Sequence, residues 1–247
     1  MGDHRARVRP ARRTRAGPRA RGYRRGVNPL TGLGPFFAVD THSAAEPAQP
    51  WRPFAEVLDD GPVLRERIAQ NRAVLGGDFV EPRVAASIAH LGLAARIISP
   101  ALGLAVGAGA VPDYSTAWWQ PKLGGAFPLS LGESEPVESD VVSAFAARVL
   151  RGPLARLDEA MAQFSLARNV RRGNVASALN GAVTVLRSER PEWTDRVSGI
   201  VAALEELPEL AGTATRENGR FRRRSCCLFY RATPDRDGPK CGDCVLA

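Results

Sequence analysis

Apolar residues recur every three or four positions through most of the chain, which is the spacing of one face of an α-helix. The first such stretch begins at Pro62, after two aspartates that can cap it, and stops at Gly76-Gly77. The second, residues 84–98, is apolar almost all round, because alanine and glycine fill most positions between its large residues. A helix of that kind is buried at the centre of a domain, and we expect Pro100 to end or kink it.

Four more stretches complete a set of six predicted helices. Their large apolar residues span 141–149, 154–164, 175–186 and 193–207. Only Phe127–Leu131 alternates in the manner of a strand, and it contains Pro128. The sequence therefore predicts a mainly α fold with minor β content over about residues 56–215.

The composition is that of a globular protein. A chain of 247 residues buries enough surface to fold without disulfides or metals. Its 44% apolar and 24% charged fractions exclude collagen-like, coiled-coil and wholly disordered classes.

The net charge of +8 is concentrated at the two ends of the chain. Residues 1–25 hold ten arginines and one aspartate, and residues 216–247 hold eight basic and four acidic residues, which leaves −5 for residues 26–215. An acidic body between basic ends lacks the continuous basic surface of a nucleic-acid-binding domain, so we expect no nucleic-acid partner. Residues 1–26 are too poor in apolar residues to fold and are predicted to be a disordered Arg-rich tail. A tail that binds nucleic acid is the alternative, and it predicts steep salt dependence that is lost on deleting residues 1–26.

No membrane or export signal is convincing. The longest uncharged run, 97–112, has 16 residues and contains Pro100 and three glycines, whereas a spanning helix needs about 20 apolar residues. Arg24-Arg25 faintly resembles a twin-arginine signal, but no clean small-residue cleavage site follows. We expect no transmembrane segment and a cytoplasmic location.

The candidate chemistry lies at the C-terminus. All four cysteines of the chain fall within the last 22 residues, at Cys226, Cys227, Cys241 and Cys244. Thiols clustered in this way, in a chain without an export signal, indicate a metal or cofactor site before disulfides.

The spacing of the cysteines bears on the type of metal. A C-x-x-C turn such as Cys241–Cys244 can direct two sulfurs at one ion, and Gly242 gives that turn backbone freedom. Adjacent residues of an extended chain point to opposite sides, so Cys226 and Cys227 both ligate only if the backbone bends or the bound object exceeds one ion. A two-iron, two-sulfide cluster is larger and takes four thiolates. The spacing favours [2Fe-2S] over zinc, with a redox dithiol or a disulfide pair as further alternatives.

The string RRSCCLFYR at 223–231, followed by CGDCVL at 241–246, resembles the C-terminal signature of the FhuF-type siderophore-iron reductases. Weaker likenesses at 34–39, 83–100 and 173–179 support the same alignment. The thirteen residues between Cys227 and Cys241 are about three more than the family pattern, and lengthening a loop by that amount costs only a few tenths of a kcal/mol.

The resemblance implies that Cys226, Cys227, Cys241 and Cys244 hold a [2Fe-2S] cluster in a segment spanning 216–247. It further implies that residues 27–215 form a mainly helical body that binds a ferric siderophore, with hydroxamates among the types considered. The activity implied is one-electron reduction of ferric to ferrous iron, with no catalytic residue beyond the cluster ligands.

The chain contains neither G-x-G-x-x-G nor a P-loop, so an external electron donor is expected. It also contains no G-x-S-x-G, the nucleophile motif of many hydrolases. The alternative function is a non-enzymatic zinc- or cluster-bearing module that binds or senses siderophore iron.

Three weaker groups of residues complete the candidates. Arg222, Arg223, Arg224 and Arg231 flank the cysteine pair, where they raise the cluster's potential, dock an acidic electron carrier, or form a solvated basic face. Trp118-Trp119 either line a loop over the chelate or pack half-buried, and packing is the more common role. His90 lies in the predicted central helix and is expected to be a hydrogen-bonded core histidine.

Overall fold

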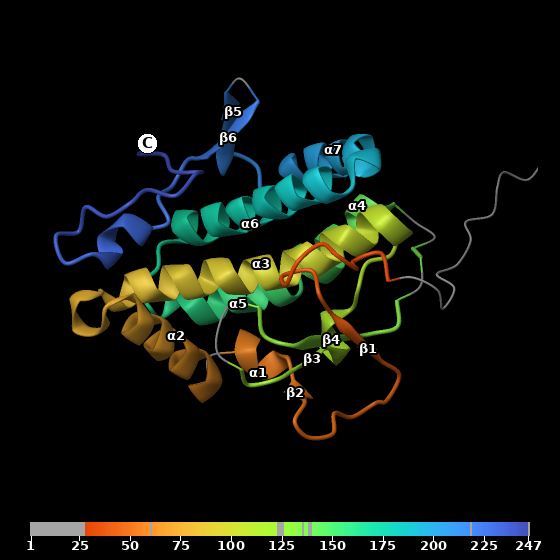
Figure 1. The fold of residues 1–247 in the computed structure, drawn as a ribbon, viewed down its shortest axis with the longest axis horizontal. Helices are drawn as coiled ribbons and strands as arrows, with labels where there is room; N and C mark the ends of the chain where they lie inside the picture. The colour runs from red at the N-terminus through yellow and green to blue at the C-terminus, as the bar shows by residue number, and fades with distance from the viewer. Residues whose placement is uncertain are drawn as a thin grey trace, which may run out of the picture.

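The computed structural model describes residues 28–59, 61–122, 126–134, 136–137, 140–217 and 219–246. The predicted disordered tail at 1–26 lies outside the described residues. The mainly α fold expected from the sequence is confirmed, with a small sheet on one side of the helices (Figure 1).

Helix α3 (Pro82–Ala108) runs through the middle of the molecule, with α6 (Arg168–Glu189) beside it and α2 (Pro62–Leu75) and α5 (Pro153–Ala162) also packed against it (Figure 1). The remaining α-helices are α1 (Ala55–Leu58), α4 (Val141–Phe145) and α7 (Thr194–Glu205). A π-helix, η3 (Ala146–Leu150), continues α4. Four 3₁₀ turns are η1 (Gly77–Phe79), η2 (Tyr114–Thr116), η4 (Pro191–Trp193) and η5 (Phe229–Ala232).

All six predicted helices are present, and Pro100 does not end the central one, because α3 continues through it to Ala108. Proline lacks the N–H that would bond the carbonyl four residues earlier, so it is costly inside a helix. Here Pro100 is buried in the core, and the hydroxyl of Tyr114 donates to the adjacent carbonyl of Ile97 at 2.5 Å. Apolar packing on both sides of Pro100 therefore holds the helix together.

Helix α3 is also long and apolar enough to cross a membrane by length and composition. In the structure, 67% of its most apolar stretch is buried inside the protein. That burial is typical of the core helix of a globular domain.

The sheet has four strands in the order β1-β4-β3-β2, with β1 parallel to β4 and the other pairs antiparallel. The strands are β1 (Asp40–His42), β2 (Arg52–Pro53), β3 (Trp118–Trp119) and β4 (Leu129–Gly132). Strand β4 confirms the strand predicted at 127–131. Trp118 and Trp119 are 8% and 2% exposed within β3, and His42 stacks on Trp118 with ring centroids 3.6 Å apart. Both tryptophans are therefore packed in the sheet, which is the more common of the two expected roles.

Arg96 of α3 joins the sheet to the segment that precedes it. Its buried guanidinium donates to the backbone carbonyls of Phe127, Phe36 and Ala38 at 3.0, 2.8 and 2.6 Å. Burial lowers the pKa of Arg96 to about 10, so the side chain stays charged at neutral pH. One side chain thus fixes residues 36–38 against α3.

A two-stranded antiparallel hairpin, β5 (Ala214–Glu217) and β6 (Arg220–Arg223), was not predicted. It projects from the helical body, and the C-terminal segment passes from it across α6 (Figure 1).

Candidate metal centre

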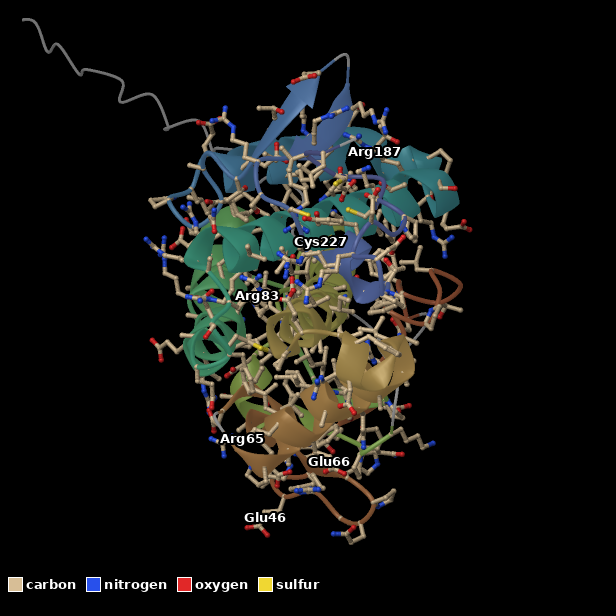
Figure 2. All side chains as sticks on the ribbon, turned by 90° about the vertical axis from the view of Figure 1, so that its left-hand side faces the viewer. Glu46, Arg65, Glu66, Arg83, Arg187 and Cys227 are labelled. Carbon is tan, nitrogen blue, oxygen red and sulfur yellow. The ribbon has the colours of Figure 1, made fainter. Side chains whose placement is uncertain are left out.

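The end of β6 carries the first cysteine pair onto the helical core. After Arg223 the chain runs against α6 and α3 and reaches Cys227, which is labelled in Figure 2. The backbone N–H of Arg223 donates to the carbonyl of Asp243 at 3.1 Å, which ties this stretch to the second cysteine pair. Two segments separated by a long loop thereby meet on one face of the helices.

Gly173 of α6 permits this close approach. A Cβ built at Gly173 would lie 2.2 Å from Oγ of Ser225 and 2.9 Å from Nη2 of Arg223. Ser225 cannot swing away freely, because its hydroxyl donates to the carbonyl of Asn169 at 2.8 Å. A helix without a side chain at position 173 is therefore needed to seat the cysteine segment.

A buried polar network anchors the backbone of the first cysteine pair. Ser87 of α3 donates from Oγ to the carbonyl of Cys227 at 2.7 Å, and Nδ2 of Asn174 on α6 donates to Oγ and the carbonyl of Ser87. Oδ1 of Asn174 accepts from Nη2 of Arg223 at 2.8 Å. Ser87 and Asn174 are fully buried, so these bonds are shielded from water and position the cysteines rigidly.

The four thiols are free and gather at this point. The sulfurs of Cys227 and Cys241 lie 3.5 Å apart. The backbone N–H of Leu228 donates to the sulfur of Cys226 at 3.2 Å, and that of Leu246 donates to the sulfur of Cys244 at 3.3 Å. Hydrogen bonds of this type stabilise negative charge on sulfur and tune metal–thiolate centres.

Among the described residues, no group of three or more His, Cys, Asp or Glu side chains is placed closely enough to hold a metal ion. The structure thus brings one sulfur pair into contact and does not close a four-thiolate cage, so binding a metal or cluster must draw the sulfurs together. Four thiols are nevertheless suitable ligands for a metal or cluster, and Arg223 adds a positive charge beside them.

Arg223 supplies a positive charge beside the thiols. It is 1% exposed, and its Nε and Nη1 atoms are buried without a hydrogen-bond partner in the described part of the chain. Its electrostatic neighbours are the thiols of Cys227, Cys241 and Cys226 and the carboxylate of Asp243. A buried guanidinium with two unpaired nitrogens is costly unless an anion faces it, and a metal–thiolate centre is such an anion.

Two of the four thiols, those of Cys226 and Cys241, have raised pKa values. Burial, together with the neighbouring thiols of Cys227 and Cys244, raises the pKa of Cys241 to about 12. Burial is also the main cause of the raised pKa of Cys226. Metal binding therefore has to release protons, and the positive charge of Arg223 favours that release.

The loop between the two pairs is held down by ion pairs. Leu228 adopts a left-handed backbone conformation with φ of 69° and starts the turn η5. Arg231 then donates to Glu81 at 2.5 Å, and Arg236 lies 3.4 Å from the same carboxylate, which precedes α3. The additional loop length is thus fastened to the end of the central helix.

The structure separates the four arginines that the sequence grouped. Only Arg223 is buried against the thiols; Arg231 pairs with Glu81, and Arg224 is exposed. Arg222 is half-buried on β6. Of these four arginines, Arg223 is therefore the one buried beside the thiols.

His90 is in the core, as expected, but the expected hydrogen bond is wrong. It is fully buried, and neither ring nitrogen has a partner among the described residues. Burial lowers its pKa to about 4, so the ring is neutral.

Ser87, Asn174 and Gly173 were not identified as site residues from the sequence. Gly173 and Asn174 lie within the 173–179 likeness, which supported only collinearity, and Ser87 lies within 83–100. No motif marks a residue that bonds a cysteine backbone from a distant helix.

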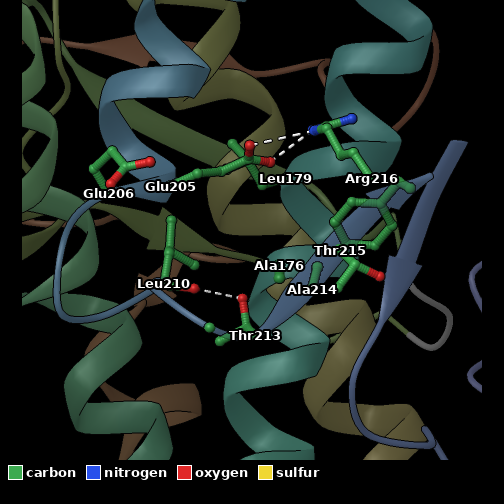
Figure 3. Close-up of a pocket in the computed structure, with 11 residues that line it drawn as sticks. Ala176, Leu179, Glu205, Glu206, Leu210, Thr213, Ala214, Thr215 and Arg216 are labelled. Atoms are coloured by element: carbon green, nitrogen blue, oxygen red, sulfur yellow. Dashed lines mark hydrogen bonds and ion pairs between the residues drawn. The ribbon is translucent and has the colours of Figure 1, made fainter. Parts of the chain in front are cut away.

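A separate cavity of about 230 Å³ lies between α6, the end of α7 and the β5–β6 hairpin (Figure 3). Arg216 and Glu205 form an ion pair at 2.6 Å across it, and Thr213 donates to the carbonyl of Leu210 (Figure 3). None of the cysteines lines this cavity. Because the cysteines lie elsewhere, this cavity is not the candidate centre.

No protein-family model, no curated protein and no solved structure matches this chain. The residues described above therefore carry the functional proposal.

Proposed function

We propose that this protein holds a [2Fe-2S] cluster on Cys226, Cys227, Cys241 and Cys244 and reduces ferric siderophore iron to ferrous iron in the cytoplasm. The observation that carries the proposal is the convergence of two cysteine pairs on a buried guanidinium with unused N–H groups. The likeness of 223–231 and 241–246 to the FhuF-type signature gives the proposal its substrate class.

When bound, such a cluster supplies single electrons: one electron passes to the ferric ion, which becomes ferrous, and one electron from an external donor protein replaces it. The chain's own residues provide the setting. Cys227 and Cys244 are each 3% exposed, which keeps water from that side, while Cys226 and Cys241 are partly exposed and face the route by which a chelate can approach. Arg223 offsets the negative charge that accumulates on reduction.

Metal analysis and spectroscopy of protein purified without oxygen test the proposal. We expect two irons per chain, visible absorbance, and an EPR signal after reduction by dithionite. Each Cys→Ser variant should lose iron or change the spectrum. The reduced protein should reduce the iron of a ferric trihydroxamate chelate to ferrous iron, with one ferrous ion formed for each electron that the protein gives up. Colourless protein with one zinc, or a Cys227→Ser variant with a normal, fully loaded cluster, contradicts the proposal.

A further inference from the structure

An apolar cavity of about 390 Å³ opens directly beside the second cysteine pair. Its walls come from α3, from α6 and from the segment that Arg96 fixes, through residues such as Leu91, Val185 and Phe36. Cys241, Gly242 and Asp243 form its edge. The cavity is therefore the one concave space among those described that is both mainly apolar and next to a candidate ligand sulfur.

One end of this cavity carries unused hydrogen-bonding groups. Ser177 of α6 is 8% exposed and lines the cavity, and its Oγ is buried without a partner among the described residues. Arg223 also lines it and has its Nε and Nη1 atoms unpaired. Buried polar groups are normally hydrogen-bonded, so an unpaired hydroxyl in a cavity indicates a missing ligand atom. Apolar walls with a few convergent polar groups are the usual make-up of a small-molecule site.

We propose that this cavity is the chelator subsite and takes an apolar arm of the ferric chelate, an arm that ends in a hydrogen-bond acceptor. This inference rests on the proposed function. The apolar part of the arm lies against Leu91, Val185 and Phe36, and its acceptor receives hydrogen bonds from Ser177 and Arg223. The iron-binding part of the chelate then remains at the mouth of the cavity, against Cys241. In that position the path of an electron from the cysteine ligands to the ferric ion is shortest.

Gly181 provides a clean way to close the cavity. It is an exposed residue of α6 that lines the cavity, and a Cβ built there meets no atom within 4 Å. Gly181→Leu therefore adds an apolar side chain that lines the cavity and whose Cβ meets no atom. Gly181→Ala gives the same change from glycine with little bulk, and Gly199→Leu places leucine at an unobstructed glycine of α7 that does not line the cavity.

Binding is measured by titration calorimetry with gallium(III) complexes, which cannot be reduced, of one trihydroxamate chelator carrying either an N-benzoyl or an N-acetyl arm. We expect the wild-type protein to bind the benzoyl complex at least tenfold more tightly. Gly181→Leu should abolish this preference, whereas Gly181→Ala and Gly199→Leu should keep it. Ser177→Ala should reduce it several-fold, because the acceptor of the arm loses one donor.

Equal affinity for the two complexes, no measurable binding of either, or an unchanged preference in Gly181→Leu each overturns the inference. Since gallium binding involves no electron transfer, these outcomes are independent of the redox assay. Selective binding by a protein that contains zinc and no iron would overturn the proposed function while leaving the subsite in place.

Discussion

Nη2 of Arg223 donates to Oδ1 of Asn174 at 2.8 Å, and this bond fixes a buried positive charge beside the thiols. The same Asn174 bonds Ser87, which in turn donates to the carbonyl of Cys227. The side-chain amide of Asn174 therefore positions both the guanidinium of Arg223 and, through Ser87, the backbone of Cys227. Neither can shift without disturbing the other.

Replacing Arg223 with glutamine should lower the reduction potential of the bound cluster. One charge in this setting is worth about 2 kcal/mol, or roughly 90 mV for a one-electron couple. Glutamine keeps an N–H donor for Asn174. We therefore expect the free energy of unfolding to change by less than the free energy of cluster reduction. The measurement is a redox titration followed by EPR.

Arg224→Gln is the matched control, because Arg224 is adjacent but exposed. Screening by water should limit its effect to a small fraction of that of Arg223→Gln. Equal shifts in the two variants would mean that the overall charge of the segment, and not the buried guanidinium, sets the potential.

Gly173→Ala should loosen the cysteine segment from α6. The new methyl group would lie 2.2 Å from Oγ of Ser225, so the hydrogen bond from Ser225 to Asn169 must break or the segment must move. We expect a loss of about 1–3 kcal/mol of unfolding free energy, even though alanine is the better helix former. Urea unfolding and the iron content of the purified protein measure the two effects.

Gly181→Ala on the same helix meets no atom within 4 Å and should stabilise the protein by up to about 1 kcal/mol. Removing the clashing hydroxyl in a Gly173→Ala, Ser225→Ala double variant should restore part of the loss. If Gly173→Ala behaves like Gly181→Ala, the close approach is not essential.

Arg96→Lys should destabilise the fold and release the segment at 36–38. A lysine ammonium cannot reproduce the planar fork by which Arg96 reaches three carbonyls, so buried acceptors lose their donors. We expect a loss of about 2–4 kcal/mol in urea unfolding. Hydrogen exchange should rise at residues 34–39.

Arg83→Lys is the control for that variant. Arg83 lies on the same helix, but its side chain is 44% exposed and pairs only with Glu81 at the surface. A change within about 0.5 kcal/mol is expected there. A similar loss in both variants would show that arginine is favoured on α3 for reasons other than the carbonyl fork.

The helices were predictable because each has an apolar face of the right period and a clear stop, as at Gly76 after α2. The persistence of α3 through Pro100 was not, since the tertiary contacts that outweigh the lost bond come from distant residues such as Tyr114. Among the strands of the sheet, β4 was visible from its alternation, whereas β1, β2 and β3, at two or three residues each, are too short to show any. Strand β3 consists of two tryptophans, and two residues carry no pattern that predicts a strand.

At the candidate centre the sequence identified the thiols, because cysteine is rare and its spacing is informative. It did not identify the groups that position them. The hydroxyl of Ser87 and the amide of Asn174 are ordinary helix residues until α3 and α6 are placed side by side. The arginine run was visible, yet only burial separates Arg223 from its exposed neighbour Arg224.

His90 should make the stability of the protein depend on pH in the acidic range. Burial lowers its pKa to about 4, whereas the same residue in the unfolded chain has a pKa near 6.5. Between these two pH values His90 is protonated in the unfolded chain and neutral in the folded protein. The free energy of unfolding therefore rises with pH across this window and falls as the pH is lowered. From pH 7 to pH 5 the loss from this residue is about 2 kcal/mol. The charged groups facing it are Asp158, which favours the proton, and Arg171 and Arg223, which oppose it.

Leucine is the informative replacement, because neither ring nitrogen of His90 has a partner among the described residues. We expect His90→Leu to unfold in urea at pH 7 at a similar or higher midpoint, and to lose about 2 kcal/mol less than the wild type on transfer to pH 5. Contributions from His42 and the carboxylates are common to both proteins and cancel in the difference. Parallel pH profiles would mean that His90 takes up a proton in the folded state, and the ring would then need an acceptor that the packing of α3 against α6 does not provide.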